Sequence, residues 1–465
     1  MDKRSKIAIL GFGDEGKAVL KYLKKHKFLN VTVCDKDINI RSQMPQGVSV
    51  NLGKDYLNDL DKFEVVFRSP GIKFLEPQVQ AAARAGTFVT SAIDYFIDQC
   101  PCPIIGVTGT KGKGTTSTLI HLMLKKKFKN VYLGGNIGEP TVNFLDKLTG
   151  KDLVVLELSS FQLQDVRKSP HYVVFLNTTT DHLDYHADRE EYMEAKEQIL
   201  SFQNKKSVAV FNKDYEYSKY YIPLTKGRVK LVSTKGKVKD GSFVKDGAIF
   251  YAKNGKIEEI AKTNEVALIG SHNLENVMPA VVIAKELGVD TNGIKDVIKT
   301  FMGLPHRLEF VREVGGVKYY NDSFSTTPET SMAAVDSFDV PTILIAGGHD
   351  KGLNYDDWAL KILTKESLRI VILIGNTAGK MEAALVDAEQ RLRPNPGLRL
   401  WKPSVLPTPT KIIRRKDLDE AVLEAYAETE PGWVVVMSPA AASFDQFRNY
   451  KERGEKFRQL TRVLK

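Results

Sequence analysis

Cysteine is scarce in this chain. Only three of the 465 residues are cysteines, an odd and sparse count that excludes a disulfide-stapled scaffold. Cys34 stands alone, and Cys100 and Cys102 form a Cys-Pro-Cys that is too tight for the usual spacing of metal ligands. The count fits a reducing compartment, so we expect a cytoplasmic protein.

Long apolar runs are also missing. The longest, such as Thr342–Ala346 and Ile370–Ile374, have the length of a strand and are far shorter than the roughly 20 residues of a membrane span. Few apolar residues lie between Met1 and Gly11, so we expect no secretory signal. The hydrophobic fraction of 42% and the charged fraction of 27% are those of a globular protein. A disordered chain, a collagen-like repeat and a membrane protein are therefore excluded.

Positive charge is in modest excess. The chain has 67 Lys and Arg against 57 Asp and Glu, a net charge of +10 that is spread along its length. The Lys-rich stretch 226–256 contains Asp-Gly at 246–247 and Asn-Gly at 254–255 between short apolar segments, which predicts β-hairpins. Basic and aromatic residues do not alternate as they do on a nucleic-acid stacking surface. We therefore expect no nucleic-acid partner.

Strand and helix patterns alternate through most of the chain, which predicts an α/β fold. At about 150 residues per domain, the length predicts three domains. Pro101 and Pro103 mark one break, and another unit begins near Leu304. We expect the domains to cover residues 1–98, 99–303 and 304–465.

A first glycine-rich loop, Gly11-Phe-Gly-Asp-Glu-Gly16, follows a predicted strand at Ile7–Leu10 and opens a predicted helix at Gly16–Lys27. Such a loop lets a phosphate approach the backbone N–H groups at a helix N-terminus. Asp35 ends the next strand at about the spacing of a ribose-binding acid. Taken alone, this pattern is typical of NAD binding, and a tight turn without a ligand remains open.

A second loop, in the run Ile104–Thr116, joins a predicted strand to a helix and contains Gly-Thr-Lys-Gly-Lys-Gly-Thr-Thr. Its backbone N–H groups can surround phosphates, Lys113 can reach the β- and γ-oxygens, and Thr115 or Thr116 can bind Mg²⁺. The predicted ATP-binding residues here are Gly109, Thr110, Lys111, Gly112, Lys113, Gly114, Thr115 and Thr116.

Further motifs follow in a fixed order. They are Gly134–Gly138, Leu156–Leu163, Asn177–Asp184, Tyr192–Lys196, Gly303–Glu309, Asn321–Ser323 and Ser438–Phe447. Together with the second loop they resemble the Mur ligase and folylpolyglutamate synthase superfamily, and within it the Mur ligases that add D-glutamate. The resemblance covers essentially the whole chain.

The resemblance implies a three-domain Mur ligase architecture: a Rossmann-like N-terminal domain, a central P-loop ATPase-type α/β domain and a Rossmann-like C-terminal domain. These would bind the UDP part of the substrate, ATP and the amino acid. It implies an ATP-dependent addition of D-glutamate to UDP-N-acetylmuramoyl-L-alanine, through an acyl phosphate and a tetrahedral intermediate, in peptidoglycan synthesis. The expected cofactors are ATP and two Mg²⁺ ions, and the expected state is a monomer.

The resemblance also assigns roles to residues. Lys113, His182 and Lys196 would be catalytic, and the metal contacts would be Thr115, Glu157, His182 and Lys196, with Lys196 carrying a carbamate formed from CO₂. Gly114 takes the usual place of the metal-binding hydroxyl, which moves that role to Thr115. Periodicity alone would make Lys196 a surface lysine, and His186 an ordinary loop histidine.

The remaining contacts come from the same resemblance. ATP would also be bound by Asn273, Arg307 and Asp322. The UDP-substrate would be bound by Gly13, Asp14, Glu15, Asp35, Lys36, Ser69, Pro70, Gly71, Asn136, Ser159, Gln162 and His182. D-Glutamate would be bound by Thr326, Lys351, Ser443, Phe444 and Tyr450. From the residues alone, Ser443 could be the N-cap of a helix that begins at Phe444, and the two roles can coexist.

Three other functions are alternatives for this sequence. A folylpolyglutamate-synthase-like glutamate ligase would lack a glycine-rich domain before the P-loop. An NAD-dependent oxidoreductase would leave the second loop and Glu157 unexplained. A nucleotide-binding protein without catalysis would not need Lys113, Glu157, His182 and Lys196 together.

Overall fold

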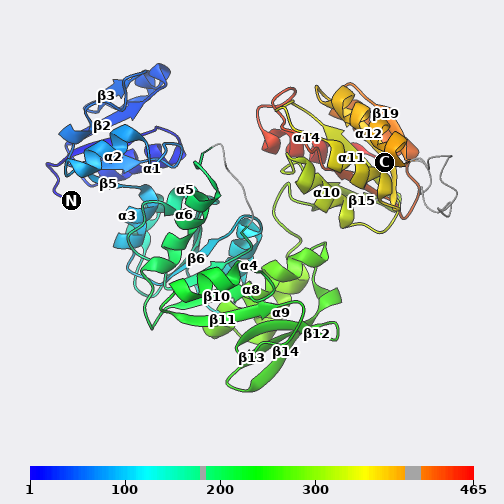
Figure 1. Ribbon diagram of the computed structural model, residues 1–465, viewed down its shortest axis with the longest axis horizontal. Helices are drawn as coiled ribbons and strands as arrows, with labels where there is room; N and C mark the ends of the chain where they lie inside the picture. The colour runs from blue at the N-terminus through cyan, green and yellow to red at the C-terminus, as the bar shows by residue number, and fades with distance from the viewer. Residues whose placement is uncertain (179–184, 393–409) are drawn as a thin grey trace. The chain divides into compact units, whose positions relative to one another are not determined.

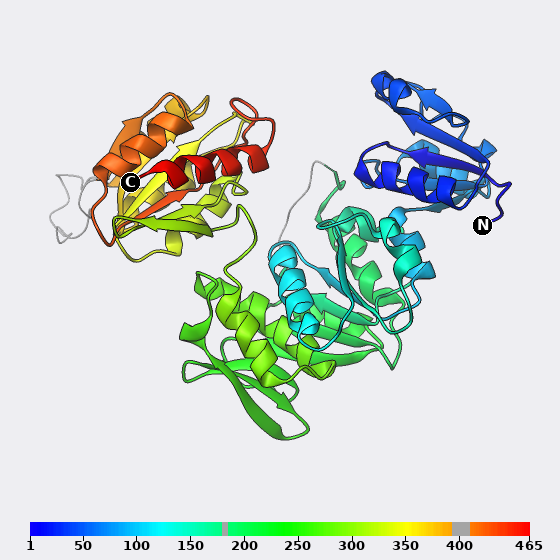
Figure 2. The same cartoon turned by 180° about the vertical axis from the view of Figure 1, so that it is seen from behind.

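The computed structural model describes residues 1–178, 185–392 and 410–465. These residues form three sheets, shown from opposite sides in Figure 1 and Figure 2. The chain forms two compact units. The first consists of Met1–Val266 with His272–Thr300, and the second of Ala267–Ser271 with Phe301–Lys465. No helix among the described residues is long and apolar enough to cross a membrane.

The N-terminal sheet, blue in Figure 1, has five parallel strands in the order β3-β2-β1-β4-β5. The strands are β1 (Lys6–Leu10), β2 (Asn30–Asp35), β3 (Ser49–Leu52), β4 (Val65–Arg68) and β5 (Phe88–Thr90). The helices are α1 (Asp14–Lys25), α2 (Pro77–Arg84) and α3 (Ala92–Gln99). The strand order reverses at β1, since β2 and β3 follow on one side of it and β4 and β5 on the other, and ligands bind at the carboxyl ends of the strands at such a switch point.

The central sheet has nine strands in the order β14-β13-β12-β11-β10-β9-β6-β8-β7. They are β6 (Ile104–Thr108), β7 (Val131–Gly135), β8 (Leu153–Glu157), β9 (Tyr172–Phe175), β10 (Val208–Asn212), β11 (Arg228–Ser233), β12 (Gly241–Lys245), β13 (Ala248–Lys253) and β14 (Lys256–Lys262). The helices are α4 (Lys113–Lys125), α5 (Ser160–Leu163), α6 (Arg189–Ser201), α7 (Ser218–Tyr221), α8 (Leu274–Glu286) and α9 (Thr291–Thr300). β12, β13 and β14 form an antiparallel ribbon at one edge.

The ribbon confirms the predicted hairpins. Its two turns have positive φ at both central residues, 46° at Asp246 and 70° at Gly247, then 52° at Asn254 and 77° at Gly255. Such a pair of left-handed residues is the requirement of a type I′ turn, which Asp-Gly and Asn-Gly meet at low cost.

The sheet of the second unit has six strands in the order β15-β16-β20-β17-β18-β19, of which only the β15–β16 pair is antiparallel. The strands are β15 (Glu309–Val314), β16 (Val317–Asn321), β17 (Thr342–Gly347), β18 (Leu368–Ile374), β19 (Lys411–Arg414) and β20 (Val434–Met437). The helices are α10 (Pro328–Asp336), α11 (Asp356–Thr364), α12 (Ala378–Leu392), α13 (Leu418–Glu428) and α14 (Tyr450–Val463).

Short 3₁₀ helices complete the described secondary structure, at Ile38–Gln43, Leu60–Lys62, Thr141–Asn143, Leu145–Lys147, Ile222–Leu224, Thr263–Glu265 and Ser271–Asn273. The predicted α/β class is confirmed. The first helix begins at Asp14, two residues before the predicted start, because Gly13 already acts as its N-cap. The predicted domain limits stay a prediction, and α3 packs Phe96 and Ile97 into the same apolar core as Ile104 of β6.

Candidate active site

The phosphate loop leaves the carboxyl end of the buried strand β6 and enters α4 at Lys113. Two glycines have no substitute there. Gly109 has φ of 143°, and a Cβ on it would lie 2.6 Å from the Cβ of Leu176. Gly112 has φ of 84°, and its Cβ would lie 2.1 Å from Oδ1 of Asn276. The backbone can thus turn closely around a phosphate, which the N-terminus of α4 attracts.

Two lysines meet on one carbonyl of this loop. Lys113 Nζ donates to the carbonyl oxygens of Gly109 at 3.1 Å and Thr110 at 2.9 Å. Lys196 Nζ, from α6, donates to the same Gly109 oxygen at 2.9 Å. Lys196 is only 1% exposed, so its interpretation as a surface lysine is wrong. The helix turns this face inward because Tyr192, one turn earlier, bonds Thr110 Oγ1 through its hydroxyl at 2.9 Å.

Glu157 ends β8 beside the phosphate loop, since β8 pairs with β6 and Glu157 is the register partner of Val107. Its side chain is 2% exposed. Oε1 accepts a hydrogen bond from Asn136 Nδ2 at 3.0 Å, whereas Oε2 is buried without a hydrogen-bond partner among the described residues. A buried carboxylate oxygen left in this state favours a cation, and Mg²⁺ prefers oxygen ligands. The residue therefore fits the predicted metal.

The two threonines of α4 differ in their surroundings. Thr116 is fully buried, and its hydroxyl lies 3.3 Å from Oδ1 of Asn276 on α8. Asn276 Nδ2 in turn donates to Asn273 Oδ1 at 2.8 Å. The predicted ATP residue Asn273 is thereby connected to Thr116 of α4 through Asn276. Thr115 is partly exposed. This difference is consistent with Thr115 as the metal hydroxyl.

The predicted residue His182 lies outside the described residues. Among those that are described, no group of three or more His, Cys, Asp or Glu side chains is placed to hold a metal ion. His186 is not an ordinary loop residue, because it is 1% exposed and connects two elements. Its Nε2 lies 2.9 Å from Ser160 Oγ and its Nδ1 3.3 Å from Glu191 Oε1. It thereby holds α5 against α6.

The first glycine loop lies at the carboxyl edge of the N-terminal sheet. A Cβ on Gly16 would lie 2.1 Å from the carbonyl oxygen of Gly11, so only glycine allows this turn. Asp35 accepts hydrogen bonds from the backbone N–H groups of Phe12 at 2.7 Å and Asp37 at 2.8 Å. The structure brings the predicted UDP residues of this domain to one edge; they are Gly13, Asp14, Glu15, Asp35, Lys36, Ser69, Pro70 and Gly71.

A cavity of about 480 Å³ lies between α1 and the loop after β7. Its lining residues are Asp14, Glu15, Lys17, Ala18, Lys21, Gly135, Asn136, Gly138, Pro140 and Asn143. Glu15 reaches from α1 to α5, where its Oε1 accepts from Gln162 Nε2 at 2.7 Å. Burial raises the pKa of Glu15. Gln162 is itself held by a capping box with Ser159, so the predicted residues Glu15, Ser159 and Gln162 form one connected group.

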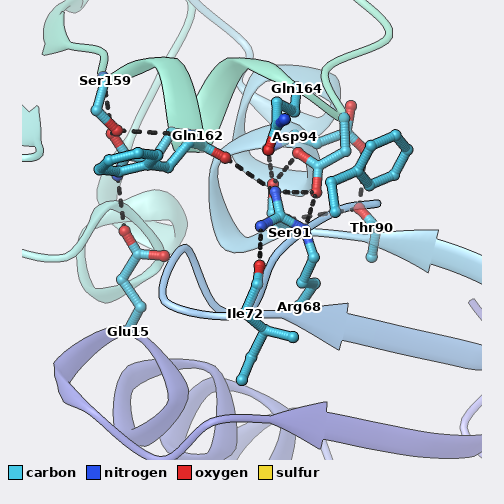
Figure 3. Close-up of polar contacts among 12 residues, drawn as sticks. Glu15, Arg68, Ile72, Thr90, Ser91, Asp94, Ser159, Gln162 and Gln164 are labelled. Carbon is cyan, nitrogen blue, oxygen red and sulfur yellow. Dashed lines mark hydrogen bonds and ion pairs between the residues drawn. The ribbon is translucent and has the colours of Figure 1, made fainter. Parts of the chain in front are cut away.

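Arg68 lies beside this group, as Figure 3 shows, and sequence reasoning missed it. Its side chain is fully buried and pairs with Asp165 at 2.8 Å. It also donates to the carbonyl oxygens of Phe161 at 2.9 Å and Ile72 at 2.7 Å. Asp165 additionally accepts from Ser91 Oγ at 3.0 Å. The sequence does contain one sign of a buried arginine, because Arg68 directly continues the apolar run Val65–Phe67 of β4.

In the second unit, Asp322 follows β16 and is 4% exposed. Its oxygens accept hydrogen bonds from Leu308 N at 3.0 Å and Ser438 Oγ at 2.7 Å. Burial raises the pKa of Asp322 to about 6. Both oxygens are thus engaged within the unit, and the predicted ribose contact stays a prediction. The guanidinium of Arg307 lies 3.8 Å from the centre of the Phe324 ring.

The predicted amino-acid residues Thr326, Lys351, Ser443, Phe444 and Tyr450 all lie in this second unit. Lys351 Nζ lies 5.4 Å from the centre of the Phe444 ring, and the Tyr450 ring meets Phe324 edge-on at 5.0 Å. The interpretation of Ser443 as a helix N-cap is wrong. The chain makes a turn after it, and the next helix begins only at Tyr450, where the side chain of Asn449 accepts from Glu452 N at 3.0 Å.

Arg453 was also missed by sequence reasoning. It is 1% exposed within α14, and burial lowers its pKa to about 10. Its guanidinium donates to Ser323 Oγ at 3.0 Å and to the carbonyl oxygens of Ala441 and Ala442 at 3.1 Å. The residue therefore joins the loop after β16 to the loop before Ser443.

Comparison with known proteins places the chain in a family. The model described as the Mur ligase middle domain matches residues 107–284, and that of the MurD-like N-terminal domain matches residues 5–91. The UDP-N-acetylmuramoylalanine–D-glutamate ligase of Acetivibrio thermocellus is 38% identical, over 99% of this chain and 97% of that protein. The ligase of the same name from Clostridium tetani is 36% identical, over 99% and 97%. The chain belongs to the UDP-N-acetylmuramoylalanine–D-glutamate ligase family.

Solved Mur ligases share the fold. A MurF ligase from Thermotoga maritima, solved with ADP, has a TM-score of 0.57 at 16% identity and is matched over 99% of this chain and 96% of that one. The UDP-N-acetylmuramate-alanine ligase MurC from the same organism has a TM-score of 0.57 at 17% identity, over 99% and 100%. The predicted three-domain Mur ligase architecture is confirmed. As a member of this family the chain is an ATP-dependent ligase, and the folylpolyglutamate-synthase-like and oxidoreductase alternatives are not favoured.

Proposed function

We propose that this chain joins D-glutamate to UDP-N-acetylmuramoyl-L-alanine in the cytoplasmic synthesis of peptidoglycan precursors. The L-alanine carboxylate attacks the γ-phosphorus of ATP, so that an acyl phosphate forms and ADP leaves. The amine of D-glutamate then attacks the acyl carbon. The tetrahedral intermediate releases phosphate with its electron pair, and the amine loses a proton. The substrates are those that the names of the relatives print.

The observation that carries this proposal is the pair of lysines on the phosphate loop. A reaction between a triphosphate and a carboxylate needs fixed positive charge between two anions. Lys113 donates to the carbonyl of Gly109 and so holds this charge beside the backbone N–H groups that would surround the phosphates. Lys196, on which we propose the carbamate, donates to the same oxygen and therefore lies at the same loop. Lys113 would stabilise the γ-phosphate as charge moves to the leaving ADP.

The metal proposal rests on Glu157. Mg²⁺, when bound, neutralises the phosphates and orients the carboxylate. We propose two ions, with Thr115, Glu157, His182 and a carbamate on Lys196 as their protein contacts. The neutral amine of Lys196 would add to the carbon of CO₂, form an N–C bond and lose a proton. A buried cation would thereby become an anionic oxygen donor on the phosphate loop, and Glu157 would supply a second one through its Oε2, which has no hydrogen-bond partner among the described residues.

The remaining contacts belong to the same proposal. The edge of the N-terminal sheet would bind UDP, and the cavity beside Asn136 would receive the sugar and L-alanine. Lys351 would pair with a carboxylate of D-glutamate, with the hydroxyls of Thr326 and Ser443 as hydrogen-bonding groups. The domains we propose are 1–98, 99–303 and 304–465, in a monomer.

The test is phosphate release from ATP with UDP-N-acetylmuramoyl-L-alanine and a panel of D- and L-amino acids. We expect release with D-glutamate and a product of the corresponding mass. Release with L-glutamate and a folate, but not with the UDP-substrate, would contradict the proposal. The matched control is Lys113→Ala, which should lower turnover by on the order of a hundredfold while the protein stays folded.

A second measurement separates the UDP and dinucleotide interpretations of the first glycine loop. Hydrogen exchange of residues 11–16 should slow with UDP-N-acetylmuramoyl-L-alanine and not change with NAD. Protection by NAD alone would contradict the proposed role of this domain.

A further inference from the structure

Cys100 and Cys102 lie where the chain passes from α3 to β6, the strand that carries the phosphate loop. Only Pro101 separates them, and their Sγ atoms are 3.5 Å apart. A disulfide bond is about 2.0 Å long, so a modest rotation of the two side chains suffices to form one. Nothing in the ligase reaction uses these thiols.

The two thiols differ in access to small molecules. Cys102 is 2% exposed and packs in the apolar core with Phe96 and Ile104, whereas Cys100 is partly exposed. A hydrogen bond from Cys102 holds the pKa of the Cys100 thiol below its ordinary value. The same bond and burial raise the pKa of Cys102. Cys100 is therefore the thiol that reacts first, because thiolates are the nucleophiles. Cys34 is fully buried in β2 and gives an internal reference.

We propose that Cys100 and Cys102 are a redox-active dithiol that takes low-molecular-weight disulfides as its co-reactant. The Cys100 thiolate attacks one sulfur of the small disulfide, and one small thiolate leaves. A mixed disulfide on Cys100 results. Cys102 then loses its proton to solvent and attacks the Cys100 sulfur, which forms the Cys100–Cys102 bond and releases the second small thiolate. Two protein thiols are oxidised and one small disulfide is reduced to two thiols.

The surroundings confine this change to the Cys-Pro-Cys segment. The next two residues are held by neighbouring strands and loops, since the Pro103 carbonyl accepts from Val154 N at 3.2 Å and Ile104 N donates to His171 Nδ1 at 3.2 Å. The link can therefore close without removing β6 from its sheet. Since β6 keeps its place, the test measures the oxidation state of the two thiols and not a change in the fold.

The experiment uses the full, reduced and folded chain with oxidised glutathione as the probe, followed by acid quenching, thiol alkylation and mass spectrometry. We expect two thiols to be lost per chain with no glutathione attached, and to return with a dithiol reductant. Cys102→Ser should hold one glutathione on Cys100, because the resolving thiol is missing. Cys100→Ser should not react, and Cys34→Ser should behave like the unaltered chain.

Two outcomes would overturn the proposal. One is a stable glutathione adduct on Cys100 of the unaltered chain. The other is a bond that forms only after denaturation. Circular dichroism checks that Cys102→Ser is folded, since Cys102 lies in the core. If that variant does not fold, the unaltered chain and Cys100→Ser still decide between a closed disulfide and no reaction.

Discussion

At the scale of single residues, Lys196 gives the sharpest test. We expect Lys196→Ala to be nearly inactive in phosphate release, because both its contact with the Gly109 carbonyl and the proposed carbamate are lost. Lys196→Arg should be equally poor, since a guanidinium does not react with CO₂. Acetate should partly restore Lys196→Ala by occupying the anionic position. An arginine variant that keeps most of its activity would contradict the carbamate.

Thr115 and Thr116 form a matched pair of variants. We expect Thr115→Ala to raise the Mg²⁺ concentration needed for half-maximal activity, and Thr115→Ser to restore it. Thr116→Ala should lower the melting temperature instead, because it removes the contact with Asn276. The measurement is activity as a function of Mg²⁺ beside a thermal melt. Equal metal dependence in the two alanine variants would show that Thr115 does not bind the metal.

Asp322 predicts a pH dependence of stability. Its pKa is about 6 in the folded chain against an ordinary 3.8, so the folded state holds this proton more tightly. Its contribution to the free energy of unfolding is fully present below pH 3.8 and falls as the pH rises to about 6 and beyond. Denaturant unfolding on either side of this pH range should show a smaller pH difference in Asp322→Asn, which keeps the shape of the side chain. An unchanged difference would exclude this group as the source.

At the scale of elements, local patterns could be predicted and distant pairings could not. The spacing of glycines predicted both loops, because positive φ and close backbone approach require glycine at fixed positions. Arg68 and Asp165 are 97 residues apart, and no local pattern joins them. The N-cap interpretation of Ser443 is wrong, although the residues that follow this serine favour a helix. The turn there is set by contacts with Arg453, which lies further along the chain.

Arg68 gives the prediction for α5. We expect Arg68→Met to raise the KM for UDP-N-acetylmuramoyl-L-alanine more than the KM for ATP, because α5 carries Gln162 and is capped by Ser159. Losing one partner of a buried ion pair should also cost about 3–5 kcal/mol of stability. Both KM values and a denaturant melt are measured.

The matched control is Arg167→Ala, which breaks the ion pair with Asp94. The Arg167 side chain is 42% exposed. Asp94 keeps its hydrogen bonds from Thr90 Oγ1 and from the backbone N–H of residue 167, so a smaller effect is expected. If both variants change the two KM values equally, α5 does not depend on Arg68 for its position.

At the scale of the whole molecule, each unit has its own cores, so we expect two unfolding transitions. All three tryptophans, Trp358, Trp401 and Trp433, belong to the sequence of the second unit. The unfolding transition that tryptophan fluorescence reports should therefore be that of the second unit. UDP-N-acetylmuramoyl-L-alanine should not shift it, because the proposed contacts of this substrate lie in the first unit. Calorimetry should show the other transition stabilised by about 2.7 kcal/mol at a hundredfold excess over Kd. Simultaneous shifts of both signals would contradict separate unfolding.

The ribbon at the edge of the central sheet affects how the protein behaves at high concentration. β14 is the outermost strand of that ribbon, and its burial pattern is mostly exposed. Lys256, Glu258, Glu259 and Lys262 place both signs of charge along the open edge. An edge strand of a second molecule could pair with β14 only by coming close to these charges. This disfavours edge-to-edge pairing of sheets between molecules. Concentrated preparations should therefore resist the cross-β association to which long unprotected sheet edges are prone.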